Sequence, residues 1–115
     1  MEKHFDFATR LANLYEKISA EEVDALLVTK VANVTYFSGF RGDSSALFVG
    51  KNFRELVTDG RYIEQAKTQA KNFSVVEQAE GLYKKLVEEI KSSGAKKIGV
   101  EANVMTVAQR DYLAR

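Results

Sequence analysis

Four apolar residues near the start of the chain recur at spacings of four, three and four positions: Phe7, Leu11, Leu14 and Ile18. With polar residues between them, this spacing predicts an amphipathic helix, which Asp6 or Thr9 can cap. The run Ala25–Thr29 is apolar up to its last residue and does not alternate with polar positions. Continuity of this kind predicts a strand that is covered on both faces, in the interior of a sheet.

The next segment mixes aromatic and polar residues: Asn33-Val34-Thr35-Tyr36-Phe37-Ser38-Gly39-Phe40. We expect Asn33 to cap a short helical turn through Phe37, and Gly39 to end that turn in the left-handed conformation. The turn places aromatic side chains beside the end of the preceding strand. Polar loops on a rigid sheet commonly form binding surfaces, so this segment is a candidate functional loop.

A hairpin is predicted after this loop. The apolar runs Ala46–Val49 and Phe53–Val57 flank Gly50-Lys51-Asn52, a three-residue connection that contains glycine. After the second strand, Asp59 can accept hydrogen bonds from the backbone N–H groups that open a helix. We expect Arg61-Tyr62 to lie in the first turn of that helix.

The rest of the chain alternates between strands and helices. We expect a strand at 73–76, a helix through 82–90 that ends at Ser92-Ser93-Gly94, and a strand at 97–101. A further helix over 104–115 is still periodic at its last residue, so we expect these residues to be a piece of a longer protein. Together the elements predict an α/β domain with a mixed sheet of about five to six strands and helices on both faces.

Composition narrows the class of protein. The 115 residues, of which 45% are hydrophobic, suit one domain, and 17 basic against 16 acidic residues leave a net charge of +1. This balance provides no basic field for nucleic acid. The chain has no cysteine, which excludes a disulfide framework and a thiolate zinc site and favours a reducing compartment. With no signal peptide or long apolar span, the sequence predicts a cytoplasmic protein that does not enter a membrane.

The residues of common hydrolytic sites are not clustered in the sequence. The single histidine, His4, lies near a terminus, so Ser44 and Ser45 lack the imidazole that a serine nucleophile requires. The acids lie mostly at helix positions expected to be solvated, such as Glu88 and Glu89, which argues against a self-contained metal site. We therefore expect no catalytic residue and no metal ligand in this chain.

The aromatic residues around the candidate loop have two interpretations. They can fill the core beneath the loop or line its surface: Tyr36, Phe37, Phe40 and Tyr62. Polar residues in the same segments are harder to assign to a core. Arg41 can pair with a peptide carboxylate through its planar guanidinium, whereas we expect Arg61 to fix Asp59 or a neighbouring carbonyl.

The order of these motifs resembles the N-terminal domain of the creatinase/prolidase family. The segment 33–40 comes first, then the hairpin, then Leu56-Val57-Thr58-Asp59-Gly60-Arg61-Tyr62, and the resemblance covers nearly the whole chain. It implies a ribonuclease H-like mixed sheet, joined to a C-terminal pita-bread domain that is absent from these 115 residues. In the family, that second domain holds a divalent metal pair (Mn, Co or Zn) and hydrolyses Xaa-Pro bonds, as a dipeptidase or an aminopeptidase.

By this resemblance, residues 1–115 form a non-catalytic domain that is inactive alone. The domain helps a homodimer to form, contacts its own catalytic domain, and closes over an active site that admits short Xaa-Pro peptides. Four residues match the substrate-access or binding loop: Asn33, Tyr36, Phe40 and Arg41. Four others match a structural motif: Asp59, Gly60, Arg61 and Tyr62. Two alternatives stay open, a peptide- or protein-binding module of a non-hydrolytic relative, and the lid domain of a creatine amidinohydrolase.

Overall fold

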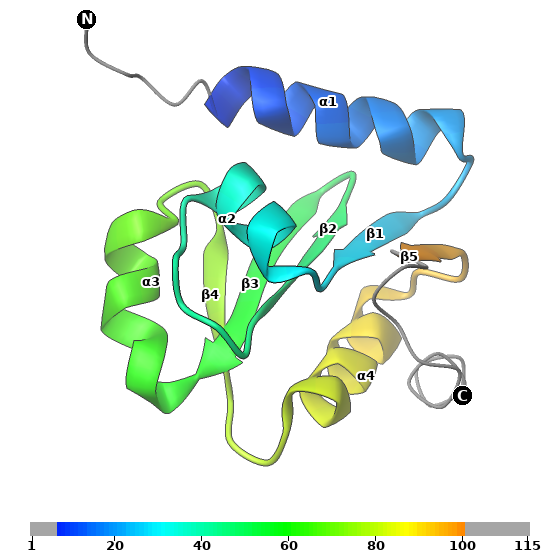
Figure 1. Ribbon diagram of the computed structural model, residues 1–115. Coiled ribbons are helices and arrows are strands. Elements are labelled where there is room, and N and C mark those ends of the chain that lie inside the picture. Colours follow the sequence, from blue (N-terminus) through cyan, green and yellow to red (C-terminus); the bar gives the residue numbers. More distant parts are fainter. Residues whose placement is uncertain (1–6, 101–115) are drawn as a thin grey trace, which may run out of the picture.

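The structure is a computed structural model that describes residues 7–100, within which helices surround a five-stranded sheet (Figure 1). The elements follow in the order α1 (Phe7–Ala20), β1 (Ala25–Val28), α2 (Val31–Ser38), β2 (Ala46–Gly50), β3 (Phe53–Asp59), α3 (Ile63–Gln69), β4 (Ser74–Gln78), α4 (Leu82–Ser93) and β5 (Ile98–Val100). A 3-10 turn, η1 (Gly60–Tyr62), joins β3 to α3. This arrangement confirms the predicted α/β class.

The sheet is mixed, as predicted. Its strands lie in the order β4-β3-β2-β1-β5, with β1–β2 and β2–β3 antiparallel and the two outer pairs parallel. Gly50 pairs with Phe53, so the hairpin connection is the two residues Lys51-Asn52 rather than the three expected. Asp24 ties the start of β1 to the start of β5, because its Oδ2 accepts hydrogen bonds from the backbone N–H groups of Lys96-Lys97 at 2.8 and 3.0 Å. These bonds lower the pKa of the Asp24 carboxyl.

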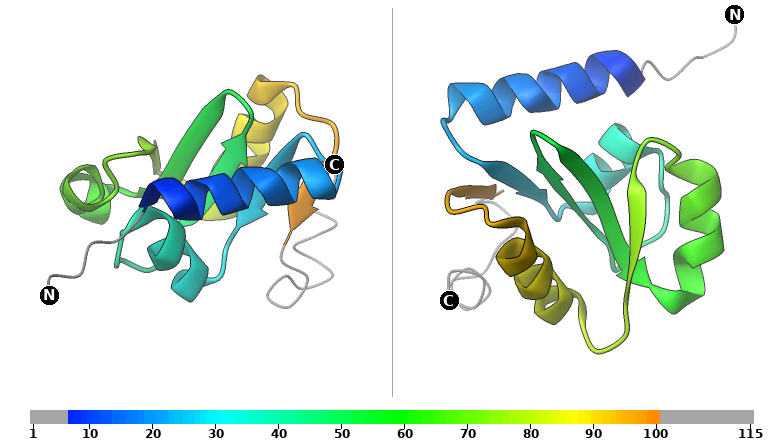
Figure 2. Two further views of the ribbon diagram at one scale, coloured as in Figure 1. Left: turned by 90° about the horizontal axis from the view of Figure 1, so that it is seen from above. Right: turned by 180° about the vertical axis from the view of Figure 1, so that it is seen from behind.

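Helices cover both faces of the sheet, which explains the continuous apolar character of β1 (Figures 1 and 2). On one face, here called the three-helix face, α1, α2 and α3 pack against alternate strand residues that include Leu26, Leu47 and Leu56. On the other, the α4 face, Leu86 of α4 packs against residues that include Phe48. The same strands therefore supply two separate apolar clusters, one on each side.

One predicted helix cap is wrong, and one of the two residues predicted to cap α1 falls outside the described residues. The N-cap of α2 is Lys30, which is extended (φ −70°, ψ 126°) and makes no side-chain cap, so Asn33 lies inside the helix. Burial accounts for this start, because α2 must begin directly after β1 to place Val34, which is fully buried, in the core. Thr9 lies inside α1, whereas Asp6 is outside the described residues.

Glycine marks two helix ends where the sequence predicted them. Gly39 (φ 88°) ends α2 and donates its N–H to the carbonyl of Thr35, and Gly94 (φ 77°) follows α4. The helix predicted over 104–115 lies outside the described residues. Between residues 7 and 100, no helix is both long enough and apolar enough to cross a membrane.

Candidate functional site

Helix α2 presents apolar side chains on its outer side as well as its inner side. Val31 and Tyr36 are the large hydrophobic residues exposed within the described part of the chain, with 47% and 44% of their surface accessible. Val34 and Ser38 of the same helix are buried. Both of these exposed residues therefore belong to α2.

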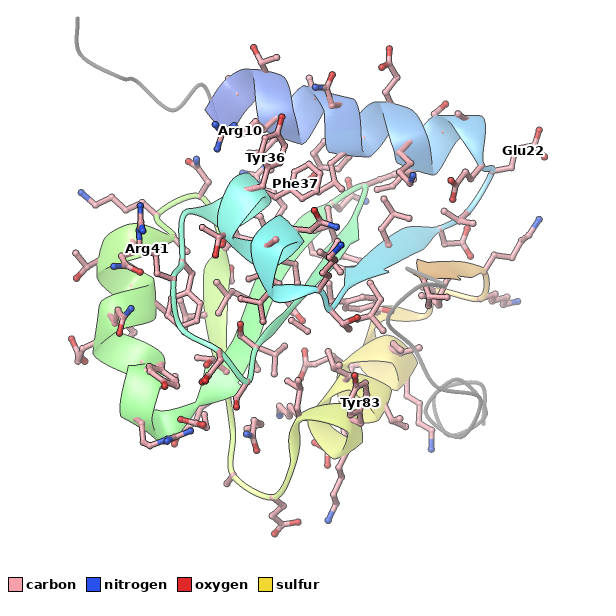
Figure 3. The ribbon with its side chains drawn as sticks, in the orientation of Figure 1. Arg10, Glu22, Tyr36, Phe37, Arg41 and Tyr83 are labelled. Atoms are coloured by element: carbon pink, nitrogen blue, oxygen red, sulfur yellow. The ribbon has the colours of Figure 1, made fainter. Side chains whose placement is uncertain are left out.

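The ring of Tyr36 is held from above by α1 (Figure 3). The guanidinium carbon of Arg10 lies 4.2 Å from the centre of the Tyr36 ring, and its Nη1 donates a hydrogen bond to the Tyr36 carbonyl oxygen at 2.8 Å. The Tyr36 ring also packs edge-to-face with the Phe37 ring, with 5.0 Å between ring centres. An exposed aromatic residue thus has a fixed position.

Phe40 is completely buried, so it does not line the surface of the loop. Its ring folds back against Gly42, where an added Cβ would lie 2.3 Å from the ring, and the edge of Tyr62 packs on it with 5.8 Å between ring centres. Of the two interpretations of the aromatic residues, core packing therefore applies to Phe40. Phe40 therefore anchors the candidate loop to the core, next to the exposed Arg41.

Hydrogen bonds fix the backbone on both sides of that anchor. The Thr35 hydroxyl donates to the Phe40 carbonyl at 2.8 Å, and the Phe40 N–H donates to Ser38 Oγ at 3.0 Å. The Arg41 N–H donates to Gln69 Oε1 of α3 at 2.9 Å, while the Arg41 residue itself is exposed. The loop therefore presents the Arg41 side chain to solvent from a restrained backbone.

A second link joins the far end of the loop to η1. The Tyr62 hydroxyl donates to Asp43 Oδ1 at 3.0 Å, and this bond to a carboxylate raises the pKa of Tyr62. The next residue, Ser44, has a φ of 54°, in the left-handed region that non-glycine residues seldom occupy. The loop is thus clamped at Phe40 and again at Asp43.

The Asp59–Tyr62 segment forms a compact turn. Asp59 Oδ1 accepts from the Arg61 backbone N–H at 2.9 Å, and its Oδ2 lies 2.8 Å from Arg61 Nη2. The Arg61 side chain lowers the pKa of Asp59 by hydrogen bonding to its charged form. At Gly60 an added Cβ would lie 2.7 Å from Glu77 Oε2. These contacts place Arg61 on its own turn rather than beside Arg41.

A hollow of about 450 Å³ lies between α1, α2 and the end of α3. Its lining residues are Arg10, Ala32, Thr35, Tyr36, Gly39, Arg41 and Gln69. Two of them carry a positive charge and none carries a negative one. Asn33 is not among them, so of the four predicted loop residues only Tyr36 and Arg41 meet at this hollow. Arg10 and Gln69 belong to it but carry no sequence signal, because their positions depend on the packing of α1 and α3.

Most of the chain matches one known protein family. Residues 10–115 match the family model described as Creatinase/Prolidase N-terminal domain. The chain belongs to this family. The predicted resemblance is therefore confirmed.

Relatives of this creatinase/prolidase domain are longer proteins. It is 34% identical over 97 residues to "Uncharacterized peptidase YqhT" of Bacillus subtilis, covering 84% of this chain and 27% of that protein. It is 31% identical over 126 residues to "Probable Xaa-Pro aminopeptidase P" of Tuber melanosporum, covering 94% of this chain and 20% of that protein. The chain thus spans 27% of the length of the first relative and 20% of the length of the second.

Solved structures show the same fold. The N-terminal domain of the cytoplasmic peptidase PepQ from Mycobacterium tuberculosis superposes with a TM-score of 0.81 at 37% identity, over 88% of this chain and 78% of that one. A Streptococcus thermophilus structure described as aminopeptidase P gives a TM-score of 0.81 at 30% identity, over 93% and 82% of the two chains. The creatinase/prolidase domain therefore recurs as a unit in proteins named as peptidases.

Within residues 7–100 the creatinase/prolidase domain has no group of three or more His, Cys, Asp or Glu side chains that could hold a metal ion. The functional groups that line the hollow are two guanidinium groups, a tyrosine side chain, a threonine hydroxyl and one amide. A guanidinium group can pair with a carboxylate through two parallel hydrogen bonds.

Proposed function

We propose that this chain is the non-catalytic N-terminal domain of a metal-dependent Xaa-Pro peptidase, and that the surface around the hollow faces the active site. The family match over residues 10–115 carries this proposal. The names of the relatives support it, because they include a probable Xaa-Pro aminopeptidase. The hollow supplies the local argument, since Tyr36 and Arg41 are exposed on restrained backbone on the same side of the domain.

In this proposal the C-terminal domain carries out hydrolysis and the N-terminal domain restricts access to the active site. A divalent pair of Mn, Co or Zn in the C-terminal domain supplies an activated water for peptide hydrolysis. The chain described here contributes a wall: Tyr36 and Val31 exclude water from an apolar surface, and Arg41 offers a planar cation to a peptide carboxylate. A wall held by the Phe40 anchor restricts access to short peptides.

The proposal extends to assembly and location. The domain contacts its own catalytic domain and a second subunit, so that a homodimer is formed, and the full protein acts on short Xaa-Pro peptides. The apolar outer side of α2 supports such a contact. The cytoplasmic location proposed for the protein agrees with the relative described as the cytoplasmic peptidase PepQ.

The test compares the 115-residue chain with the full-length protein, each incubated with Xaa-Pro dipeptides and Mn²⁺ or Co²⁺. We expect turnover by the full-length protein and none by the chain alone. Metal-dependent turnover by the chain alone would overturn its non-catalytic role. Preference of the full-length protein for creatine over Xaa-Pro peptides would assign the chain to a creatine amidinohydrolase. A following sequence without spaced metal ligands, together with no turnover, would assign it to a binding module.

A further inference from the structure

Two partly buried acidic residues, Glu55 and Glu89, lie between the sheet and α4, away from the hollow. Glu55 of β3 falls between Phe53 and Val57, both of which belong to the apolar cluster on the α4 face. Strand alternation therefore points the Glu55 side chain at that face. Its Oε1 is inaccessible to solvent and has no hydrogen-bond partner among the described residues. A carboxylate oxygen in this position is costly unless it receives a proton or a donor.

The group that meets Glu55 is another carboxyl. Glu89 of α4 lies within hydrogen-bonding reach of it, and only 18% of the Glu89 side chain is exposed. The sequence-based expectation that Glu89 is solvated is therefore wrong, because α4 turns this position toward the sheet. Two ionised carboxylates cannot hydrogen-bond to each other, whereas a single shared proton joins them.

The cations near Glu55 and Glu89 differ in which partners they contact. Lys85 Nζ lies 3.4 Å from Glu89 Oε2 and 3.5 Å from Glu88 Oε1, so its charge is divided between two partners on α4. Lys51 and Arg54 line the depression that also contains Glu55. Arg54 donates from Nε to the carbonyl of Asn72 at 2.9 Å. Lys85 of α4 is thus the cation that forms an ion pair with Glu89, one of the two acidic residues.

We infer that the Glu55–Glu89 pair is a proton-dependent clasp that docks α4 on the sheet and loosens as the solution becomes neutral to alkaline. The proton held between the two carboxyls supplies the donor that the buried oxygen lacks. When it leaves, two negative charges face each other across the α4 face, with Lys85 as the compensating cation. The inference is independent of the peptidase assignment.

The protonation of Glu55 sets the pH range. Burial, followed by the hydrogen bond and charge of Glu89, raises the pKa of Glu55 to about 7, against the opposing charge of Lys85. A raised carboxyl pKa means that the folded chain holds a proton that the unfolded chain has already lost. The clasp therefore stabilises the fold fully below about pH 4.5, loses this contribution as the pH rises toward 7, and contributes nothing further above it.

The first test uses the unmodified chain. We expect the side-chain carboxyl carbon of Glu55, followed by NMR, to titrate with a midpoint near 7. In Glu89→Gln, the new amide can donate to ionised Glu55, so the midpoint should fall below that of the unmodified chain, although burial of Glu55 still raises it. A Glu55 midpoint near 4.5 in the unmodified chain would overturn the inference.

The second test measures the docking of α4. Between pH 5 and pH 8 we expect the melting temperature of the unmodified chain to fall by roughly 5 °C. Hydrogen exchange, corrected for its intrinsic pH dependence, should rise more for α4 than for α1. Glu55→Gln keeps a permanent donor and should remove this difference, whereas Glu64→Gln, which makes the same charge change at an exposed position of α3, should keep it. Equal pH dependence in Glu55→Gln and the unmodified chain would contradict the clasp.

Discussion

The two faces of the sheet are held in different ways. On the three-helix face, the cluster that anchors the loop is apolar and closed, and it contains Phe40, Val34 and Leu56, each with no exposed surface. On the α4 face, one helix covers the apolar cluster, and one oxygen of the neighbouring Glu55 carboxyl is inaccessible to solvent. Apolar contacts do not depend on pH, whereas a buried carboxyl pair does. We therefore expect the face presenting the hollow to be the more rigid one, and the stability of the α4 face to change with pH.

The largest expected effect comes from removing the anchor of the rigid face. Phe40→Ala leaves a cavity beneath the loop and should lower the free energy of unfolding by about 4 kcal/mol. Phe53→Ala is the matched control on the α4 face, where the ring is only partly buried against Phe48, and it should cost about 2 kcal/mol. Urea unfolding measures both values. Equal losses would contradict the contrast between the faces.

A smaller effect is expected at Gly42. A methyl group there would meet the Phe40 ring at 2.3 Å, so Gly42→Ala must displace the ring or the loop, at a cost of about 1–3 kcal/mol. The control is Gly94→Ala, which has open space but a positive φ of 77°, and which should cost about 1 kcal/mol. If Gly42→Ala unfolds at the same urea concentration as the unmodified chain, the loop is not packed against its anchor.

The smallest effect on stability is expected at Arg41, where the functional effect should be largest. In the full-length protein, Arg41→Ala should reduce kcat/KM for an Xaa-Pro dipeptide about tenfold, the worth of one charge-assisted hydrogen bond. Its melting temperature should stay within about 2 °C of the unmodified protein, because the side chain is exposed. Lys91→Ala, an exposed position on α4, is the control for loss of charge. Unchanged kinetics with a large fall in melting temperature would make Arg41 a structural residue.

Signals confined to a few neighbouring residues predicted most of the fold. The unbroken apolar run of β1 indicated an interior strand, because burial on both faces leaves no position for a polar side chain. Gly39 indicated the end of α2, since the left-handed conformation is a property of that single residue. The prediction that Asn33 caps α2 was wrong because it also relied on a single residue. The Asn33 side chain suits a cap, but the burial of Val34 sets where the helix starts.

The candidate site was harder to predict because its contacts join distant residues. Arg10 and Tyr36 are 26 positions apart, and Arg41 and Gln69 are 28 apart, so no local pattern records either contact. Glu55 and Glu89 come from a strand and a helix that meet only after the sheet has formed. Sequence patterns gave the elements that carry these side chains, whereas the packing of the helices on the sheet determined which side chains meet.

The strand order has a consequence for the way the chain folds. The antiparallel pairs at the centre of the sheet join neighbouring segments, so β1, β2 and β3 can assemble early with little loss of chain entropy. The edge formed by β5 is different, because Ala25 pairs with Ile98 across most of the described chain. During synthesis β1 therefore has one open edge until β5 has left the ribosome. Such an edge is a template for pairing with other chains, which makes the time before β5 emerges the period of greatest risk of aggregation.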